Sequence, residues 1–325
     1  MFDSVLKSVA NKTKGCTIVN SFEFKSLKQN QLIFFLKPEI FLSANLEHLK
    51  KSLEIVEQQF STFNIDVDGI ALLSGDWLSD HEIMDRHYGY INLMSKSASS
   101  SLDDANKEII YSHFKNDESP ILGAHEVLEA NPDLTPTSLD DLWMSKKSIK
   151  IRGGQYVQEY TINNTPTIVV NGFHPSQLHH YTQDDRYIAI FLICSDLPWS
   201  ILRDVMIGDT FPDKAMKGSL RNTMLQKSDD IGIDRVSVAN NCSHLSAGPY
   251  EALSEMNNFF SPILGSQWNL NDSNLIKKGT EMGIDVNTLS NSILNPSLSI
   301  GLQNLDLFDS TENVDTLSSL RLINI

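Results

Sequence analysis

Cysteine is scarce in this chain. Its 325 residues include 3 cysteines, Cys16, Cys194 and Cys242. An odd number of thiols cannot all pair with one another, and these three do not stand at the spacing of a metal site. The sequence therefore argues against a disulfide framework. We expect the protein to work in a reducing compartment, the cytoplasm.

Long hydrophobic runs are also missing. The longest apolar run covers residues 187–194, whereas a helix needs about 20 apolar residues to cross a bilayer. The first residues of the chain lack the apolar core of a signal peptide. We therefore expect neither a membrane span nor a membrane partner.

Basic residues are few beside the acidic ones. The chain has 26 Lys and Arg against 41 Asp and Glu, which gives a net charge of −15. The electric field of a protein with this negative charge repels the phosphate backbone of nucleic acids, so no polymeric nucleic acid is expected as a partner. A small anion can still bind where a few Lys, Arg and backbone N–H groups converge.

What the chain does contain is a series of strand and helix signals typical of an α+β domain. Strands are expected where short runs are apolar or alternate, and helices where apolar residues recur every three or four positions. The expected strands are 31–36, 66–73, 187–194 and 235–239. The expected helices are 45–60, 79–88 with Ser79 as N-cap, 199–207 and 248–260. This order predicts a ferredoxin-like, split β-α-β antiparallel sheet with helices on its faces.

Composition divides the chain into three parts. Residues 1–28 are an N-terminal segment, and residues 29–260 carry the strand and helix pattern. A polar, turn-rich stretch at about 95–170, with a hairpin turn at 163–164, is expected to be an inserted subdomain. Residues 261–325 are rich in Asn and Ser, and we interpret them as an appended module or an oligomer arm. We expect a homo-oligomer.

The segment NNCSHLSAGPYEALSEM carries the strongest chemical signal. Asn241 stands three residues before His244, Ser246 two after it and Glu255 eleven after it. A carboxylate can hold a histidine ring in one tautomer and make it a nucleophile. The adjacent pair His179 and His180 cannot face one metal from a helix, and no Cys or carboxylate stands at metal-site spacing from it, so a dedicated metal site is not expected.

Groups suited to a polyphosphate lie earlier in the chain. The stretch DTFPDKAMKGSLR supplies Thr210 and Arg221, and Lys37 follows the apolar strand 31–36. A guanidinium has five donors that suit a phosphate, and cations stabilise charge on a transferred phosphoryl group. Together with His244, these residues indicate phosphoryl transfer through a phosphohistidine.

These pieces resemble the nucleoside diphosphate kinase family. The matching stretches are LIFFLKPE, HY, MIGDTFP, KGSLR and NCSH, and they cover about half the chain in pieces. The spacing from Thr210 to Arg221, and that from Asn241 through His244 to Glu255, are family-like without gaps. The resemblance implies a ferredoxin-like fold. It also implies that a histidine takes the γ-phosphoryl of a nucleoside triphosphate and passes it to a diphosphate acceptor.

Carried over residue by residue, the resemblance implies that His244 is the phosphorylated residue and that Glu255 orients its ring. The residues implied on the nucleotide side are Lys37, Tyr88, Arg203, Thr210, Arg221, Asn241 and Ser246, with Phe173 or His174 as the base-stacking group. The implied donor is ATP or another nucleoside triphosphate. Mg²⁺ would be bound through the nucleotide phosphates, so no cage of protein ligands is expected.

The chain departs from the family on the base and acceptor side. After Tyr88 the family's arginine and phenylalanine give way to GYINLMSKSASS, and Arg203 stands one residue further from Thr210 than in the family. Leu245 and Ala247 occupy positions where the family has Gly and Asp. We interpret these changes as a changed acceptor. The alternatives are a nucleotide-binding regulatory protein without turnover, and a kinase or nucleotidyl transferase for a non-standard metabolite.

Overall fold

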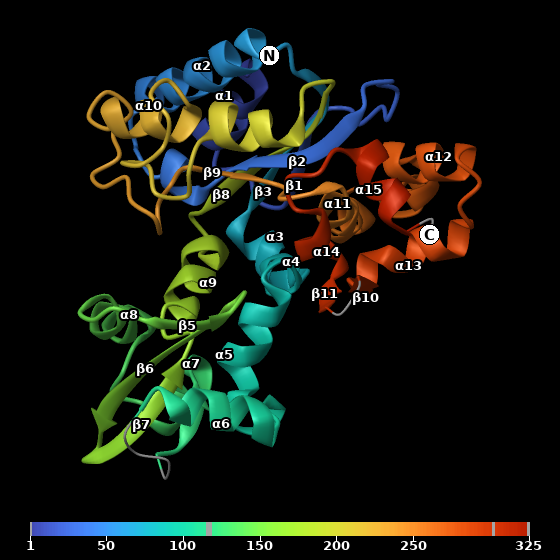
Figure 1. Cartoon of the computed structure of the whole chain (residues 1–325). Helices are drawn as coiled ribbons and strands as arrows, with labels where there is room; N and C mark the ends of the chain where they lie inside the picture. The colour runs from blue at the N-terminus through green and yellow to red at the C-terminus, as the bar shows by residue number, and fades with distance from the viewer. Residues whose placement is uncertain (1, 115–118, 301–302, 324–325) are drawn as a thin grey trace. The chain divides into compact units, whose positions relative to one another are not determined.

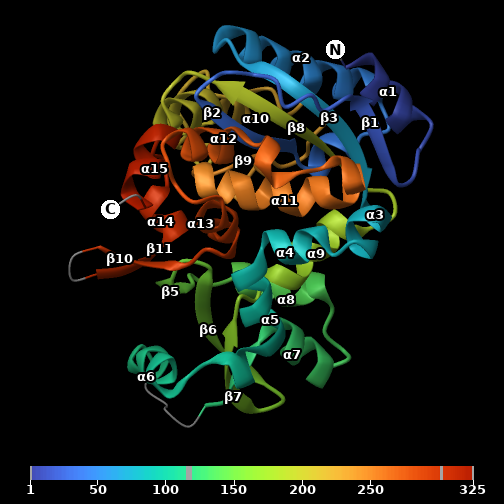
Figure 2. The ribbon, with the colours of Figure 1, turned by 90° about the vertical axis from the view of Figure 1, so that its right-hand side faces the viewer.

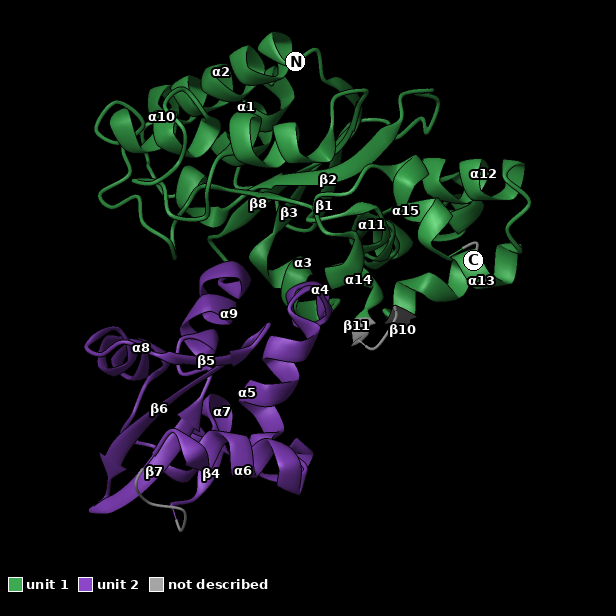
Figure 3. Ribbon diagram, in the orientation of Figure 1, with its two compact units in different colours: residues 1–81, 184–325 green, residues 82–183 purple. Residues whose placement is uncertain are grey.

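The structure is a computed structural model of the whole chain, and residues 2–114, 119–300 and 303–323 are described. The chain forms two compact units, one of residues 1–81 with 184–325 and one of residues 82–183 (Figure 3). The second unit begins earlier and ends later than the insertion expected at about 95–170.

The first unit is built around one sheet of five strands with helices on its faces (Figure 1). The strands are β1 (Cys16–Asn20), β2 (Asn30–Leu36), β3 (Asp66–Ser74), β8 (Tyr187–Ser195) and β9 (Ser243–Leu245). Their order across the sheet is β1-β3-β8-β2-β9, and every neighbouring pair is antiparallel. The unit therefore has mixed α+β architecture.

The helices of the first unit precede, connect and follow these strands. They are α1 (Asp3–Ala10), η1 (Pro38–Phe41), α2 (Leu46–Thr62), α3 (Gly75–Asp80), η2 (Ile201–Ile207), α10 (Leu220–Gln226), α11 (Pro249–Leu264), η3 (Gly265–Gln267), η4 (Leu270–Asp272), α12 (Asn274–Glu281), α13 (Val286–Asn291), η5 (Ser292–Leu294), α14 (Leu307–Thr311) and α15 (Thr316–Ile323). A hairpin of β10 (Ser297–Ile300) and β11 (Gln303–Asp306) precedes α14. The helix η2 has π-type hydrogen bonding.

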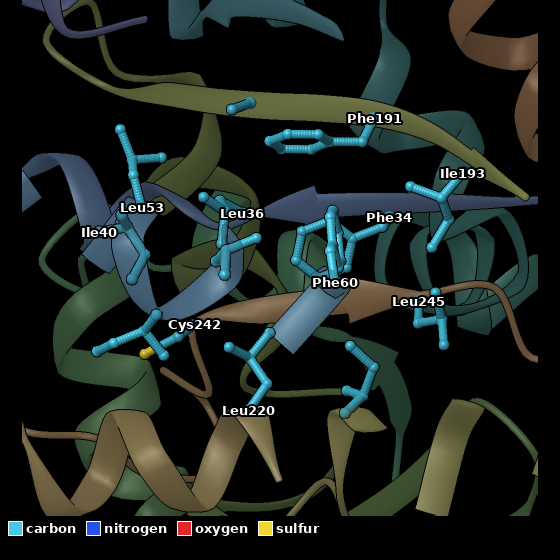
Figure 4. Close-up of a cluster of buried hydrophobic side chains, with 14 of the residues drawn as sticks. Phe34, Leu36, Ile40, Leu53, Phe60, Phe191, Ile193, Leu220, Cys242 and Leu245 are labelled. Carbon is cyan, nitrogen blue, oxygen red and sulfur yellow. The ribbon is translucent and has the colours of Figure 1, made fainter. Parts of the chain in front are cut away.

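Strand β2 is buried throughout, and its residues 32–36 are all apolar, as expected where both faces of a sheet are covered. Phe34 meets Phe60 of α2 edge-on, with ring centroids 5.1 Å apart. Its neighbour Phe35 points to the other face, where Phe259 of α11 lies 5.9 Å from it. Figure 2 shows α2 and α11 on opposite sides of the strands, and Figure 4 shows Phe34, Phe60 and Phe191 of β8 packed together.

Helix α2 begins where its sequence signals place it. The Asn45 side chain accepts a hydrogen bond from the backbone N–H of Glu47, as an N-cap does. Leu49, Leu53 and further apolar residues at this spacing are buried in the core. The three- and four-residue spacing of apolar residues predicts Leu46 on the same buried face, but Leu46 is 40 % exposed, because it stands at the first turn of the helix.

The second unit has its own four-stranded sheet, in the order β4-β7-β6-β5. Its elements are α4 (Ile83–His87), α5 (Gly89–Ser101), α6 (Asp104–Ser112), β4 (Ile121–Gly123), α7 (Ala124–Ala130), α8 (Pro136–Met144), β5 (Ile149–Arg152), β6 (Gln155–Ile162), β7 (Thr165–Val170) and α9 (His174–Thr182). Asn163 and Asn164 both have positive φ, 50° and 63°, which is the geometry of a tight hairpin turn. The expected hairpin at 163–164 is confirmed.

Two of the expected elements are wrong. Residues 235–239 are not a strand; the edge of the sheet beside β2 is formed by β9, so His244 lies within a strand and not in a loop. Ser79 lies inside α3 and is not an N-cap. Glu82, with a left-handed φ of 49°, separates α3 from α4, so the single helix expected at 79–88 is two short helices.

Candidate functional site

His244 is fixed by the pairing of β9 with β2. It lies opposite Phe35 in the antiparallel register. The two rings stack, with centroids 4.5 Å apart and planes inclined by 16°. Helix α11 begins a few residues later with Pro249 in its first turn. This turn brings Glu255 back to the histidine, where its Oε1 lies 2.7 Å from His244 Nε2.

Glu255 is itself held by the sheet. It is buried, and its second oxygen, Oε2, accepts a hydrogen bond of 2.5 Å from the Ser246 hydroxyl. That hydroxyl in turn accepts from the backbone N–H of Ile33 in β2 at 2.9 Å. The resemblance placed Ser246 on the nucleotide side, and that role stays a prediction. In the structure its hydroxyl is buried and donates to the carboxylate of Glu255.

The contact with Glu255 decides the tautomer of His244. An ionised carboxylate accepts hydrogen bonds only, so the ring proton is on Nε2 and the lone pair is on Nδ1. Burial lowers the pKa of His244 well below its ordinary value, and the charges of Lys37, Arg221 and Arg203 lower it further. The ring is therefore neutral near pH 7, which is the state required of a nucleophile.

Lys37 brings a buried positive charge into this region. It follows β2 and is 8 % exposed. Its ammonium group makes no hydrogen bond or ion pair with the residues that the structure describes. Burial lowers its pKa to about 8, against the opposing effect of the Glu39 carboxylate. A buried ammonium without such a partner is costly, and an anionic ligand would offset that cost.

Glu39 was missed by the sequence analysis. Its Oε1 accepts a hydrogen bond of 2.7 Å from the backbone N–H of Cys242, and the Cys242 carbonyl accepts one of 3.0 Å from the N–H of Lys37. Cys242, which lies just before His244, is thus hydrogen-bonded to the segment that follows β2. In the sequence, the only signal for Glu39 was its position two residues after Lys37.

Arg221 joins two further pieces of the site. Its Nη1 donates to the carbonyl of Gly208 at the end of η2, and its Nη2 donates to the carbonyl of Ser243 in β9, both at 2.9 Å. Gly208 has a φ of +93°, and an added Cβ would lie 2.3 Å from the Ser219 hydroxyl. A glycine is therefore required at position 208. The two hydrogen bonds to backbone carbonyls orient the Arg221 guanidinium before any ligand binds.

Asn241 has an unsatisfied buried acceptor. The residue is 2 % exposed. Its Nδ2 donates to the carbonyl of Thr210 at 3.2 Å, while its buried Oδ1 has no hydrogen-bond partner among the residues that the structure describes. The buried hydroxyl of Ser243 likewise lacks a partner within this described part of the chain. Because such groups cost free energy when left unpaired, they favour a ligand that brings donors and acceptors, such as a sugar hydroxyl. Thr210 itself is exposed.

Arg203 lies on η2 and is close enough for its charge to lower the pKa of His244. Its Nη1 contacts the carbonyl of Ala247 at 3.3 Å, Glu312 Oε1 at 2.6 Å and Asn313 Oδ1 at 3.2 Å. No motif near residues 312 and 313 indicated this contact from the sequence.

The other three expected residues belong to the second unit. Tyr88 Oη lies 3.2 Å from Tyr181 Oη. Both ring nitrogens of His174 are engaged, at 3.1 Å each, with the side-chain oxygens of Gln177 and Asn92. Phe173 lies against the rings of Trp143 and Tyr156, with both centroid distances 6.0 Å. Their roles as phosphate and base contacts stay predictions.

Comparison of the chain with protein-family models, with curated proteins and with solved structures returned no match. In the described part of the chain, no helix has the length and apolar character needed to cross a bilayer.

Proposed function

We propose that the first unit is a phosphotransferase that moves the γ-phosphoryl group of a nucleoside triphosphate to His244 and then to an acceptor. The main support is the imidazole ring of His244, which contacts the Glu255 carboxylate and is neutral near pH 7. The charges of Lys37, Arg221 and Arg203 lie close enough to lower its pKa. A phosphoryl group in transfer carries negative charge, which positioned cations stabilise. The same cations would repel a positively charged substrate.

The architecture supports a ferredoxin-like fold of the nucleoside diphosphate kinase type as part of this proposal. Leaving out β1, the strands occur along the chain in the order β2, β3, β8 and β9 and stand in the sheet as β3-β8-β2-β9. Helix α2 connects the first two, and η2 with α10 connects the last two. A split β-α-β unit has this arrangement.

The reaction has two steps: His244 is first phosphorylated and then returned to its neutral form. In the first, the Nδ1 lone pair forms a bond to the γ-phosphorus, and the bond from that phosphorus to the bridging oxygen breaks, which releases a diphosphate. The ring then carries positive charge, which Glu255 stabilises through Nε2–H. In the second, an oxygen of the acceptor forms a bond to the same phosphorus, the N–P bond breaks, and neutral His244 is regenerated.

The remaining residues bind and orient the donor. Lys37 and the guanidinium of Arg203 suit the phosphates, and the buried Oδ1 of Asn241 suits a hydroxyl of the sugar. Mg²⁺ would enter with the nucleotide and neutralise part of its phosphate charge. The acceptor we propose is a nucleoside diphosphate or a nucleotide-like metabolite.

Labelling with radioactive nucleotides tests this function. The protein is incubated with γ-labelled ATP and Mg²⁺, and in parallel with α-labelled ATP. We expect an acid-labile, base-stable phosphoprotein from the γ-label, and none from the α-label. Because Glu255 occupies Nε2, the digest should contain the Nδ1 isomer of phosphohistidine. A panel of nucleoside diphosphates should discharge the label.

Each alternative gives a different result. Label from α-labelled ATP would indicate nucleotidyl transfer. Nucleotide binding without label would indicate a regulatory protein. Label on Nε2 would contradict the role given to Glu255.

The pH dependence of the first step should reflect two shifted groups. The pKa of His244 lies well below its ordinary 6.5, so the ring stays neutral throughout the neutral range. The pKa of Lys37 is about 8, so its charge is lost as the pH rises through that value. We expect kcat/KM for phosphoenzyme formation to be level from about pH 6.5 and to fall above about pH 8. A profile still rising at pH 9 would contradict this assignment.

A further inference from the structure

A segment near the C-terminus lies against the turn that follows His244. The backbone N–H of Asn313 donates to the carbonyl of Ala247 at 2.9 Å. A Cβ added to Gly248 would lie 2.5 Å from the carbonyl oxygen of Thr311, so the two backbones are in close approach. Residues 311–316 thus pack directly on the connection between β9 and α11, the two elements that carry His244 and Glu255.

Buried hydrogen bonds anchor this segment to the sheet. Asp315 Oδ1 accepts from the N–H of Trp199 at 2.7 Å and from Asn30 Nδ2 at 3.1 Å. Asn30 Oδ1 accepts from both the N–H and the hydroxyl of Thr316 at 3.0 Å. Asn30 and Trp199 are fully buried. The segment is therefore fixed relative to β2 and to the start of the helix that carries Arg203.

The anchored segment holds Arg203 by a single nitrogen. The three hydrogen bonds that the guanidinium makes with described residues, Ala247, Glu312 and Asn313, all come from Nη1. Its Nε and Nη2 have no hydrogen-bond partner among the described residues. The Glu312 side chain is 47 % exposed, so its ion pair with Arg203 is partly open to solvent and contributes little to folding.

We propose that Glu312 and Asn313 are positioning residues, which fix Arg203 so that its Nε and Nη2 bind the terminal phosphate of a polyphosphate ligand. The C-terminal extension is then a working part of the site. The ligand class rests on the proposed function. Holding one nitrogen removes rotational freedom that a flexible arginine would lose on binding, and this raises affinity by preorganisation.

Electrostatics alone predicts the opposite effect. Glu312 carries a negative charge close to the proposed anion site, so its removal should strengthen anion binding if charge is all that matters. Under the proposal its removal weakens binding, because Arg203 is no longer held. The sign of the change therefore separates the two interpretations.

The test uses the full-length protein and inorganic tripolyphosphate, with the dissociation constant measured by titration calorimetry. We expect Glu312→Ala to weaken binding roughly 5- to 20-fold, and Glu312→Gln, which keeps an acceptor oxygen, to recover most of that loss. Asp309→Ala is the matched control, because Asp309 is an exposed acid on the neighbouring α14. It should stay within about twofold of the wild type.

A double-mutant cycle completes the experiment. In an Arg203→Ala background, Glu312→Ala should have no further effect, since the arginine on which it acts is absent. Melting temperatures measured for every variant separate a binding change from a folding defect. Equal or tighter binding by Glu312→Ala, or no binding by the wild type, overturns the proposal. Calorimetry needs no turnover, so a protein that binds tripolyphosphate through Arg203 but forms no phosphohistidine contradicts the proposed function alone.

Discussion

His244→Asn is expected to abolish the phosphoprotein label and to lower phosphoryl transfer by at least about 10³-fold, because the nucleophile is removed. Asparagine is chosen because its amide N–H can still serve as a donor towards the buried Glu255 carboxylate, which alanine would leave without its 2.7 Å contact. The measurement is single-turnover labelling with γ-labelled ATP.

The matched control for this variant is His179→Asn. His179 is an exposed residue of α9, so the change is chemically identical but far from the proposed chemistry along the chain. Its labelling should equal that of the wild type. His244→Asn should still bind tripolyphosphate, because Lys37 and Arg203 remain. Full labelling of His244→Asn would rule out the assigned nucleophile.

The sequence predicted best where a signal is local and long. The run 187–194 is apolar at every position, which is typical of a strand covered on both faces, and β8 (Tyr187–Ser195) is wholly buried. The spacing in α2 and its Asn45 cap also sufficed to predict that helix. These patterns act within one element, so no knowledge of its neighbours is needed.

The failures have a common physical cause. Residues 235–239 alternate as a strand does, but a strand exists only where another strand offers hydrogen bonds. At that edge β2 pairs with residues 243–245. Likewise, the break at Glu82 depends on a left-handed backbone conformation that its side chain does not signal.

The site shows the same division. The pair His244 and Glu255 could be predicted because β9 and α11 are adjacent in the chain, so a fixed spacing brings them together. Glu312 contacts Arg203 across a sequence separation of 109 residues. Such a contact depends on the packing of the C-terminal segment, and nothing in a single sequence specifies it.

Lys37→Met is expected to weaken tripolyphosphate binding about 10- to 100-fold and at the same time to stabilise the fold. Folding lowers the pKa of Lys37 from 10.5 to about 8, so the folded chain holds this proton less tightly than the unfolded chain. At pH 7 that difference costs on the order of 3 kcal/mol as an upper bound. Methionine has a similar length and no charge, and we expect a gain of about 1–3 kcal/mol in the free energy of unfolding.

The pH dependence gives the stability effect its signature. The cost of charging Lys37 is fully present below about pH 8 and fades as the pH approaches 10.5, where the lysine of the unfolded chain also loses its proton. Urea unfolding curves of wild type and variant should therefore differ at pH 7 and approach each other as the pH rises through about 10.5. Lys217→Met, at an exposed position, is the control and should change stability by less than about 0.5 kcal/mol. Equal stability of Lys37→Met and wild type at pH 7 would contradict a buried, charged lysine. A gain in the free energy of unfolding together with weaker tripolyphosphate binding would mean that Lys37 contributes to ligand binding and destabilises the fold.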